Sequence, residues 1–147
     1  MRASEAAATF EPHLNGSLAR PQFGKWISTV AVSENGQWMA CGGGPQLSLW
    51  HLRSQSQAAV LEKPDFIPYS LEFQDNIVVA GGNGESLHHW YTNGKQKCSI
   101  PCSIGTVFCV ALNQRQKHDS KPMVAAGTNH SIDVFCNLSY RSHTLAL

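Results

Sequence analysis

The sequence has few charged residues for its length. Asp, Glu, Lys and Arg make up 14% of its 147 residues, against roughly 25% in an average globular domain. The 11 basic and 10 acidic residues leave a formal net charge of +1. A nucleic-acid-binding surface normally needs clustered basic side chains. The balance therefore disfavours direct binding of RNA or DNA.

Long apolar runs are also missing. No stretch approaches the roughly 18 apolar residues that a membrane span requires, so we expect no membrane partner. Near the amino terminus, Glu5 and Glu11 stand where a signal peptide would have an apolar segment. The cysteines are odd in number and lie mostly in apolar, strand-like runs. They are Cys41, Cys98, Cys102, Cys109 and Cys136. We expect ordinary buried thiols in a reducing compartment.

Helix signals are close to absent, and one strand-rich pattern occurs three times. The copies begin at Ile27, Tyr69 and Phe108. Each has an apolar strand, a polar turn, a second strand ending in Ala and Gly, a small-residue turn, and a third strand ending in an aromatic residue. Trp50 and Trp90 are 40 residues apart, and Phe135 follows 45 residues later. A period of about 40–45 residues with four short strands is typical of a β-propeller blade.

The alanines that end the second strands set a frame for aligning the copies. Ala40 and Ala80 are 40 residues apart, and Ala126 follows 46 residues later, so we align these three residues. Turns are expected at 33–36 and 92–95, where Gly tolerates a positive φ. A fourth strand is expected in each unit, around residues 58–61, 96–100 and 142–147.

The glycine cluster at 42–44 raises the question of a phosphate site. A phosphate loop places its glycines between a strand and a helix. Here the next segment, 47–52, alternates with period two and is therefore a strand. No Gly-Lys-Ser/Thr follows. The glycines are thus expected to turn the chain, and no cofactor is expected.

The first unit, VAVSENGQWMACGGGPQLSLWHL (30–52), resembles a WD40 repeat, with Trp50 at the position that names the family. It departs at the next position, where the family's Asp is His51. Three segments together resemble the carboxy-terminal part of the THO complex subunit 6 family. They are residues 24–54, NIVVAGGNG (76–84) and IDVFCNLSYRSHTLAL (132–147).

This resemblance implies an all-β fold of WD40-type β-propeller blades, about three four-stranded blades forming an incomplete propeller. It implies a non-catalytic scaffold subunit of the THO/TREX complex, in the nucleus, which supports mRNA processing and export. The implied partners are other THO subunits, with RNA reached only through the complex and no small-molecule substrate. Propellers close with about 4–8 blades, so three units are expected to be part of a longer propeller.

Two other functions remain open. One is a WD40 adaptor of another complex, such as a ubiquitin-ligase substrate receptor. The other, more remote, is a hydrolase on a propeller or sandwich fold, with Cys109 and His118 as a nucleophile and base. Cys109 lies in an apolar strand and no G-x-S-x-G elbow is present, so we expect no catalytic residue.

Metal sites and glycosylation are weighed in the same way. His88 and His89 are adjacent in a strand, so they point to opposite faces and do not share an ion. Cys98 and Cys102 lack a second pair at zinc-finger spacing. We expect no metal ligands. The sequons at Asn15, Asn129 and Asn137 are interpreted as chance matches.

The domain organisation follows from the repeats. Residues 1–25 are expected to be a connector with the remnant of a preceding blade, and residues 26–147 three blades, at about 26–65, 66–104 and 105–147. Recognition in propellers uses loops and rims. The binding residues are unknown, but three segments are candidates: residues 113–122, residues 62–70 with an exposed Phe66, and residues 11–25.

Overall fold

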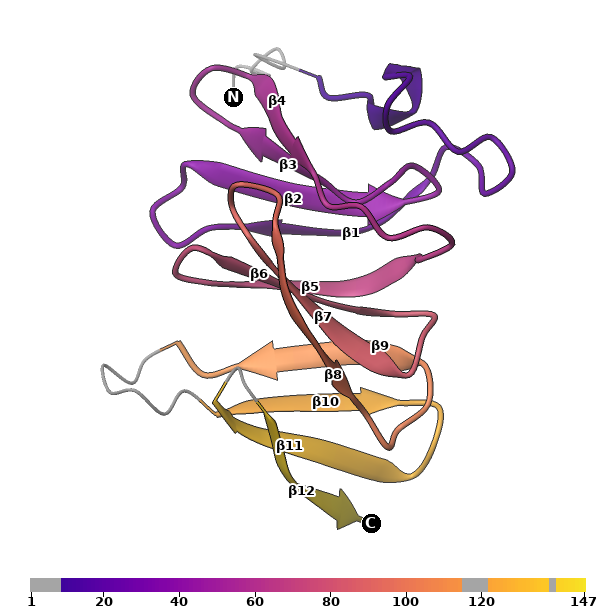
Figure 1. The fold of residues 1–147 in the computed structure, drawn as a ribbon, viewed down its shortest axis with the longest axis vertical. Coiled ribbons are helices and arrows are strands. Elements are labelled where there is room, and N and C mark those ends of the chain that lie inside the picture. The colour runs from indigo at the N-terminus through magenta and orange to yellow at the C-terminus, as the bar shows by residue number, and fades with distance from the viewer. Residues whose placement is uncertain (1–8, 115–121, 138–139) are drawn as a thin grey trace, which may run out of the picture.

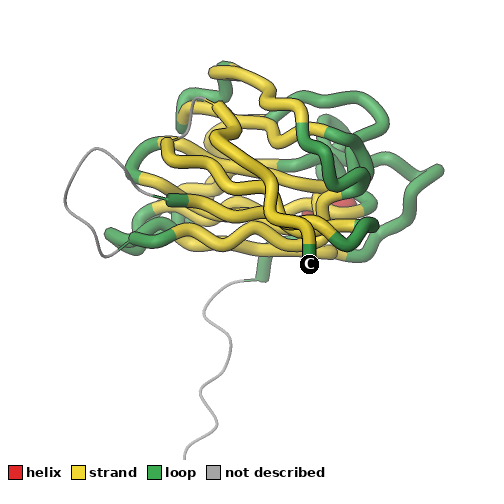
Figure 2. Tube along the Cα trace, turned by 90° about the horizontal axis from the view of Figure 1, so that it is seen from below, coloured by secondary structure: helices red, strands yellow, loops and turns green. Residues whose placement is uncertain are grey.

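The structure is a computed structural model, which describes residues 9–114, 122–137 and 140–147. Within these residues the fold is all-β, with twelve strands in three four-stranded antiparallel sheets. The single helical element described is a 3₁₀ turn, η1 (Pro12–Leu14), and Figure 2 shows how completely strands dominate the body. The expected all-β, blade-like architecture is confirmed, and the ring is not closed. The described part of the chain contains no helix long and apolar enough to cross a membrane.

Each sheet is formed by four consecutive strands in chain order. The first contains β1 (Ile27–Val32), β2 (Trp38–Gly43), β3 (Ser48–His51) and β4 (Ser56–Val60). The second contains β5 (Pro68–Gln74), β6 (Ile77–Gly82), β7 (Ser86–Tyr91) and β8 (Gln96–Pro101). The third contains β9 (Val107–Leu112), β10 (Met123–Gly127), β11 (Ser131–Asn137) and β12 (Tyr140–Ala146). The sheets are stacked, with the first at one end and the third at the other (Figure 1).

The tight turns lie where the sequence predicts them. Between β1 and β2, the Gly36 N–H donates to the Ser33 carbonyl at 2.9 Å, and Gly36 has a φ of 69°. Between β7 and β8, the Gly94 N–H donates to the Tyr91 carbonyl at 3.0 Å, with a φ of 89° at Gly94. Glycine adopts these left-handed conformations without the steric cost of a Cβ.

The strand pairing shows which residues are equivalent in the three sheets. Trp50 pairs with Met39, Trp90 with Val78, and Phe135 with Met123. The three aromatic residues therefore occupy one position in the repeat, as predicted.

The alignment of Ala40, Ala80 and Ala126 is wrong, because the three alanines occupy three successive repeat positions. Ala40 pairs with Leu49, whereas Ala80 pairs with His88. The structural equivalents of Ala80 are Cys41 and Ala125. The turn between β2 and β3 is one residue shorter than its counterparts, so residue spacing alone could not place both strands.

Apolar clusters fill the two spaces between the sheets. One joins the first and second sheets and includes Ala40, Leu49, Leu71, Phe73, Val78 and Trp90. The other joins the second and third sheets and includes Val79, Leu87, Val107, Val110, Met123 and Phe135. No sheet covers its own apolar faces, so burial between neighbouring sheets stabilises the stack.

Two glycines allow the sheets to approach closely. A Cβ at Gly42 would lie 2.7 Å from Cγ of Pro68, the first residue of β5. A Cβ at the equivalent Gly81 would lie 2.9 Å from Cβ of Val107, the first residue of β9. The same close contact is therefore used at both sheet-to-sheet interfaces.

Residues 9–25, here called the N-terminal segment, pack on the outer side of the first sheet. Phe10 lies edge-on to Trp50, with ring centroids 5.2 Å apart. Leu18 is fully buried beside Trp50 and Cys41. The segment thus covers the tryptophan that has no preceding sheet to cover it.

Arg20 fastens this segment to the first two sheets. Its guanidinium donates to the carbonyls of Gly43 and Gly44 at 2.8 Å each, of Phe66 at 2.9 Å and of Pro45 at 3.2 Å. The side chain is 7% exposed. Burial in and around these two loops removes water from the four carbonyl groups. The guanidinium of Arg20 replaces water as their hydrogen-bond donor.

Candidate interaction surfaces

The glycine cluster at 42–44 is filled by protein atoms. Gly42 and Gly43 end β2, and a Cβ at Gly43 would lie 2.8 Å from the Ser28 backbone nitrogen. A Cβ at Gly44 would lie within 3.0 Å of the Phe23 carbonyl oxygen. These glycines serve close packing of backbone on backbone more than they turn the chain. The cluster is followed by the strand β3 and not by the helix that a phosphate loop requires.

The third strand of each sheet carries one buried polar side chain at the same repeat position. These are Ser48, His88 and Asp133, each at most 4% exposed. Ser48 accepts a hydrogen bond from Trp50 Nε1 at 2.9 Å. His88 Nδ1 lies 2.7 Å from Ser99 Oγ. Each group is satisfied within its own part of the fold, which is the condition for burying it without a large penalty.

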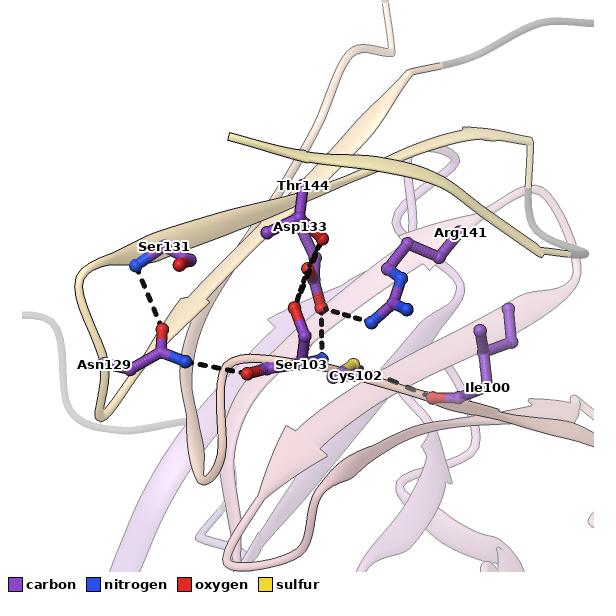
Figure 3. A network of polar contacts seen from close by, with 8 residues as sticks. All are labelled: Ile100, Cys102, Ser103, Asn129, Ser131, Asp133, Arg141 and Thr144. Atoms are coloured by element: carbon purple, nitrogen blue, oxygen red, sulfur yellow. Dashed lines mark hydrogen bonds and ion pairs between the residues drawn. The ribbon is translucent and has the colours of Figure 1, made fainter. Parts of the chain in front are cut away.

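Asp133 is the centre of the largest of these networks (Figure 3). Its carboxylate accepts from the Ser103 N–H at 2.7 Å, Ser103 Oγ at 2.5 Å and Thr144 Oγ1 at 2.6 Å. Arg141 Nη1 lies 3.6 Å from Asp133 Oδ2. The network ties β11 to β12 and to the connection that precedes β9.

The acidity of Asp133 follows from these contacts. Burial alone would raise the pKa of the Asp133 carboxyl, but hydrogen bonds from Ser103 and Thr144, with the charge of Arg141, outweigh it and lower that pKa. The group is held as a carboxylate, and all its described contacts hold strands and loops together.

The adjacent histidines occupy different surroundings. The ring of His88 lies edge-on to Phe66, with centroids 4.9 Å apart. Burial, with the nearby charges of Lys63 and His89, lowers the pKa of His88 to about 4, so its imidazole is neutral near pH 7. His89 Nδ1 lies 3.4 Å from Cys98 Sγ. Within the described residues, no group of three or more His, Cys, Asp or Glu is placed to hold a metal ion.

The cysteines are less buried than the sequence predicts. Cys41 is buried and Cys98 and Cys102 are half-buried, but Cys109 and Cys136 are exposed. The expectation of mostly buried thiols is wrong because the outer side of the third sheet has no neighbouring sheet. Burial, reinforced by Asp133, raises the pKa of Cys102 to about 11. Burial also raises the pKa of Cys41. His118, the imagined base for Cys109, lies outside the described residues.

The three predicted binding segments have different outcomes. Most of residues 113–122 lies outside the described residues. In residues 62–70, the expectation of an exposed Phe66 is wrong: its side chain is 4% exposed. Phe66 fills the space between the first two sheets, against His88 and near Trp90. Residues 11–25 form the N-terminal segment described above.

Two of the sequons have a local structural role. Asn15 Oδ1 accepts from the Ser17 N–H at 3.0 Å, and Asn129 Oδ1 accepts from the Ser131 N–H at 3.0 Å. The Asn-x-Ser spacing is the one that such Asx turns require. The side chain of Asn137 lies outside the described part.

The outer side of the first sheet presents an open apolar surface, here called the leading face. It consists of Ile27, Val30 and Val32. Val30 is 58% exposed and Val32 54%, whereas the equivalent Leu71 and Phe73 in the second sheet are 5% and 3% exposed. The leading face is thus the surface on which a preceding sheet packs elsewhere in the chain.

The far side of the third sheet is open in the same way. This trailing face consists of Val124, Ile132, Val134 and Leu145. Val124 is 38% exposed and Leu145 47%, whereas Ala40 and Val79, the equivalents of Val124, are fully buried. Contiguous exposed apolar surface of this kind marks interaction sites. The leading and trailing faces are therefore the candidate interaction surfaces.

Sequence reasoning missed Arg20, Asp133 and both faces. The sequence did mark Asp133 as unusual, since it is a single acidic residue inside the apolar run IDVF. The faces could have been found by asking which strand positions lack a neighbour at each end of a three-unit stack. Arg20 had no signal, because its four acceptors are backbone carbonyls from distant loops.

Three equivalent four-stranded sheets, stacked face to face without closing, define a set of WD40-like propeller blades. No protein-family model matches the chain. The THO complex subunit 6 homolog of Danio rerio is 42% identical over 128 residues, which cover 87% of this chain and 38% of that protein. THO complex subunit 6 of Homo sapiens is 32% identical over 99% of this chain and 42% of its own length. That of Drosophila melanogaster is 40% identical over 91 residues, 62% of this chain and 25% of its length.

The chain is therefore homologous to the part of THO complex subunit 6 with which it aligns. It spans about two fifths of the length of the first two of these relatives.

Proposed function

We propose that this chain is a non-catalytic scaffold of a THO complex, acting in the nucleus. It supports mRNA processing and export through contacts with other THO subunits, and meets RNA only through the complex. The observation that carries the proposal is the similarity to THO complex subunit 6 over 87–99% of the chain. The near-neutral charge, +1, fits a protein whose partners are proteins.

The chemistry of the buried groups supports a role without catalysis. The thiols of Cys41 and Cys102 have raised pKa values, and His88 is neutral near pH 7. A nucleophilic thiol needs the opposite change, a lowered pKa. The hydrogen bonds of Asp133 are those of a structural tie between strands.

The domain organisation belongs to the same proposal. Residues 1–25 are a connector with the remnant of a preceding blade, and residues 26–147 form three blades. The exposed leading and trailing faces support a place within a larger propeller-type assembly. Its binding surfaces for other subunits lie on the rims and open faces of these blades.

Affinity purification from nuclear extract with mass spectrometry tests the proposal. The tagged chain should enrich THO subunits over a tagged, unrelated WD40 propeller. The variant Trp90→Ala, which removes a side chain that is 1% exposed, is a control for dependence on folding. Enrichment of cullin adaptors in place of THO subunits would show that the chain serves a ubiquitin ligase.

A further inference from the structure

A hollow lies where the first and second sheets meet, at the edge of the stack formed by the turns that follow β1 and β5 (Figure 1). It is here called the acidic hollow and has a volume of about 360 Å³. Its lining includes Glu34 from the first turn, Asp75 and Asn76 from the second, Trp38 at the start of β2 and Thr92 after β7. The two sheets face each other at this interface, so the hollow does not depend on what covers the outer sides of the stack.

The charge of the acidic hollow has one sign. Glu34 and Asp75 are exposed and come from different sheets. Among the described residues, no lysine or arginine lines the hollow. Arg53 and Lys95, in the connections that follow β3 and β7, are exposed and lie outside the lining. A concave surface with charge of one sign favours a ligand of the opposite sign, so the hollow is suited to a cation.

Trp38 gives the hollow an aromatic side. The strand pairing makes Ile77 its equivalent in the second sheet, so the repeat does not require an indole at this position. Trp38 is half-buried and packs against the apolar cluster between the first two sheets. A cation within about 6 Å of an indole is attracted by the electrons of its ring. This favours an organic cation, whereas no group of three or more metal-binding side chains is present in the described residues.

Hydrogen bonds within the turns hold the hollow in shape. The Ser33 hydroxyl donates to Asn35 Oδ1 at 2.7 Å and accepts from the Trp38 N–H at 3.0 Å. The Thr92 N–H donates to the Asn76 carbonyl at 3.1 Å, which ties the end of β7 to the turn after β5. A surface that is formed before its ligand arrives loses less conformational entropy on binding.

We propose that the acidic hollow binds an arginine side chain of a partner protein. A guanidinium is planar, stacks on aromatic rings and presents five N–H donors. The hollow offers Trp38 and the oxygen acceptors of four side chains, those of Glu34, Asp75, Asn76 and Thr92. A lysine ammonium is a compact, strongly hydrated charge that makes less use of such a surface. That the arginine belongs to a protein rests on the proposed function.

Titration of the 147-residue chain with N-acetyl-arginine amide tests the site. The indole N–H signal of Trp38, identified by its absence from the spectrum of Trp38→Phe, should shift saturably in the millimolar range in nitrogen–hydrogen correlation NMR spectra. N-acetyl-citrulline amide, which has nearly the same shape but no charge, should not shift it. The indole signal of Trp26, which is 47% exposed and lies outside the lining, should stay in place with both compounds.

A pair of conservative substitutions locates the binding. Glu34→Gln combined with Asp75→Asn should weaken binding at least about fivefold. Asn readily adopts the positive φ of 52° found at Asp75. The matched control is Glu62→Gln combined with Asp65→Asn, which removes the same charge at the opposite end of β5. Asp65 also has a positive φ, 60°, and this control pair should bind as the wild type does.

The absence of a saturable shift, equal shifts with the arginine and citrulline compounds, or equal losses in the two double variants would each overturn the site. No other subunit takes part in this titration, so its outcome is independent of whether the chain enriches THO subunits. In the affinity purification, Glu34→Gln combined with Asp75→Asn should recover at least one THO subunit less well than the control pair. Unchanged recovery of every subunit would overturn the docking role and leave the proposed function intact.

Discussion

Replacing Asp133 by Asn removes one buried charge while leaving the shape of the side chain nearly unchanged. In the folded protein, the carboxylate accepts three hydrogen bonds, from the Ser103 N–H, Ser103 Oγ and Thr144 Oγ1. Asn keeps one acceptor oxygen but turns an NH₂ group toward some of these donors. The variant therefore loses hydrogen bonds and gains a donor-to-donor contact.

The expected loss of unfolding free energy is set by the hydrogen bonds. A hydrogen bond to a charged group contributes about 1.5–3 kcal/mol. Since Asn retains part of the network, we expect a loss of about 2–4 kcal/mol at pH 7. Arg141 adds little, because its side chain is 38% exposed and a screened ion pair contributes about 0–1 kcal/mol.

The dependence on pH gives the prediction its specificity. The pKa of Asp133 is lowered in the folded protein, whereas an unfolded Asp has a pKa of about 3.9. The stabilisation by the carboxylate is therefore fully present above about pH 5 and is lost as the pH falls through the folded-state pKa. Asn does not titrate, so the difference in stability between wild type and variant should shrink as the pH falls through the lowered folded-state pKa of Asp133.

Urea unfolding followed by tryptophan fluorescence between pH 7 and pH 2.5 measures the difference. Glu34→Gln, which changes an exposed carboxylate in a turn, is the matched control and should alter stability by less than about 0.5 kcal/mol. A difference between wild type and Asp133→Asn that stays constant over this range would refute the reasoning, because the charge would then not be the stabilising group.

Three further predictions concern single side chains. Trp50→Ala should lower the unfolding free energy by about 3–5 kcal/mol in urea titrations, since the side chain is a large buried one at 8% exposure; an unchanged midpoint would place Trp50 on the surface. Arg20→Met should cost about 2–3 kcal/mol by the same measurement, because several carbonyls lose their donor; a neutral effect would mean that water satisfies them. Iodoacetamide followed by peptide mass spectrometry should modify Cys109 and Cys136 well before Cys41, which is 5% exposed and has a raised pKa; equal rates would contradict the burial described here.

The repeat architecture could be predicted because it is local. Strand alternation, turn residues and the aromatic residue ending each third strand all lie within about 40 residues of one another. They correctly placed Trp50, Trp90 and Phe135 at one repeat position. The misplacement of Ala40 arose in a turn, where length varies without changing the strands that follow, whereas Ala126 was aligned in place of its neighbour Ala125.

What could not be predicted depends on contacts between sheets. Phe66 was interpreted as exposed because it lies in the connection between two strands, yet it packs against His88 of β7. Arg20 binds carbonyls up to 46 residues away in the sequence. Cys109 is exposed because its sheet is the last of the three. Each outcome is decided by which sheet lies next to the residue, and that information is not local.

The most direct test of the stacked-sheet account is a double-mutant cycle between Gly81 in β6 and Val107 in β9. A Cβ at Gly81 would lie 2.9 Å from Cβ of Val107 and closer still to its Cγ1. Gly81→Ala should therefore destabilise the protein by about 1–3 kcal/mol through overpacking. Val107→Ala removes the obstructing methyl groups. The double variant should therefore lose less unfolding free energy than the sum of the two single losses, by at least about 0.5 kcal/mol. Strictly additive effects would mean that the second and third sheets do not pack on each other at this point, and would contradict the stack of blades.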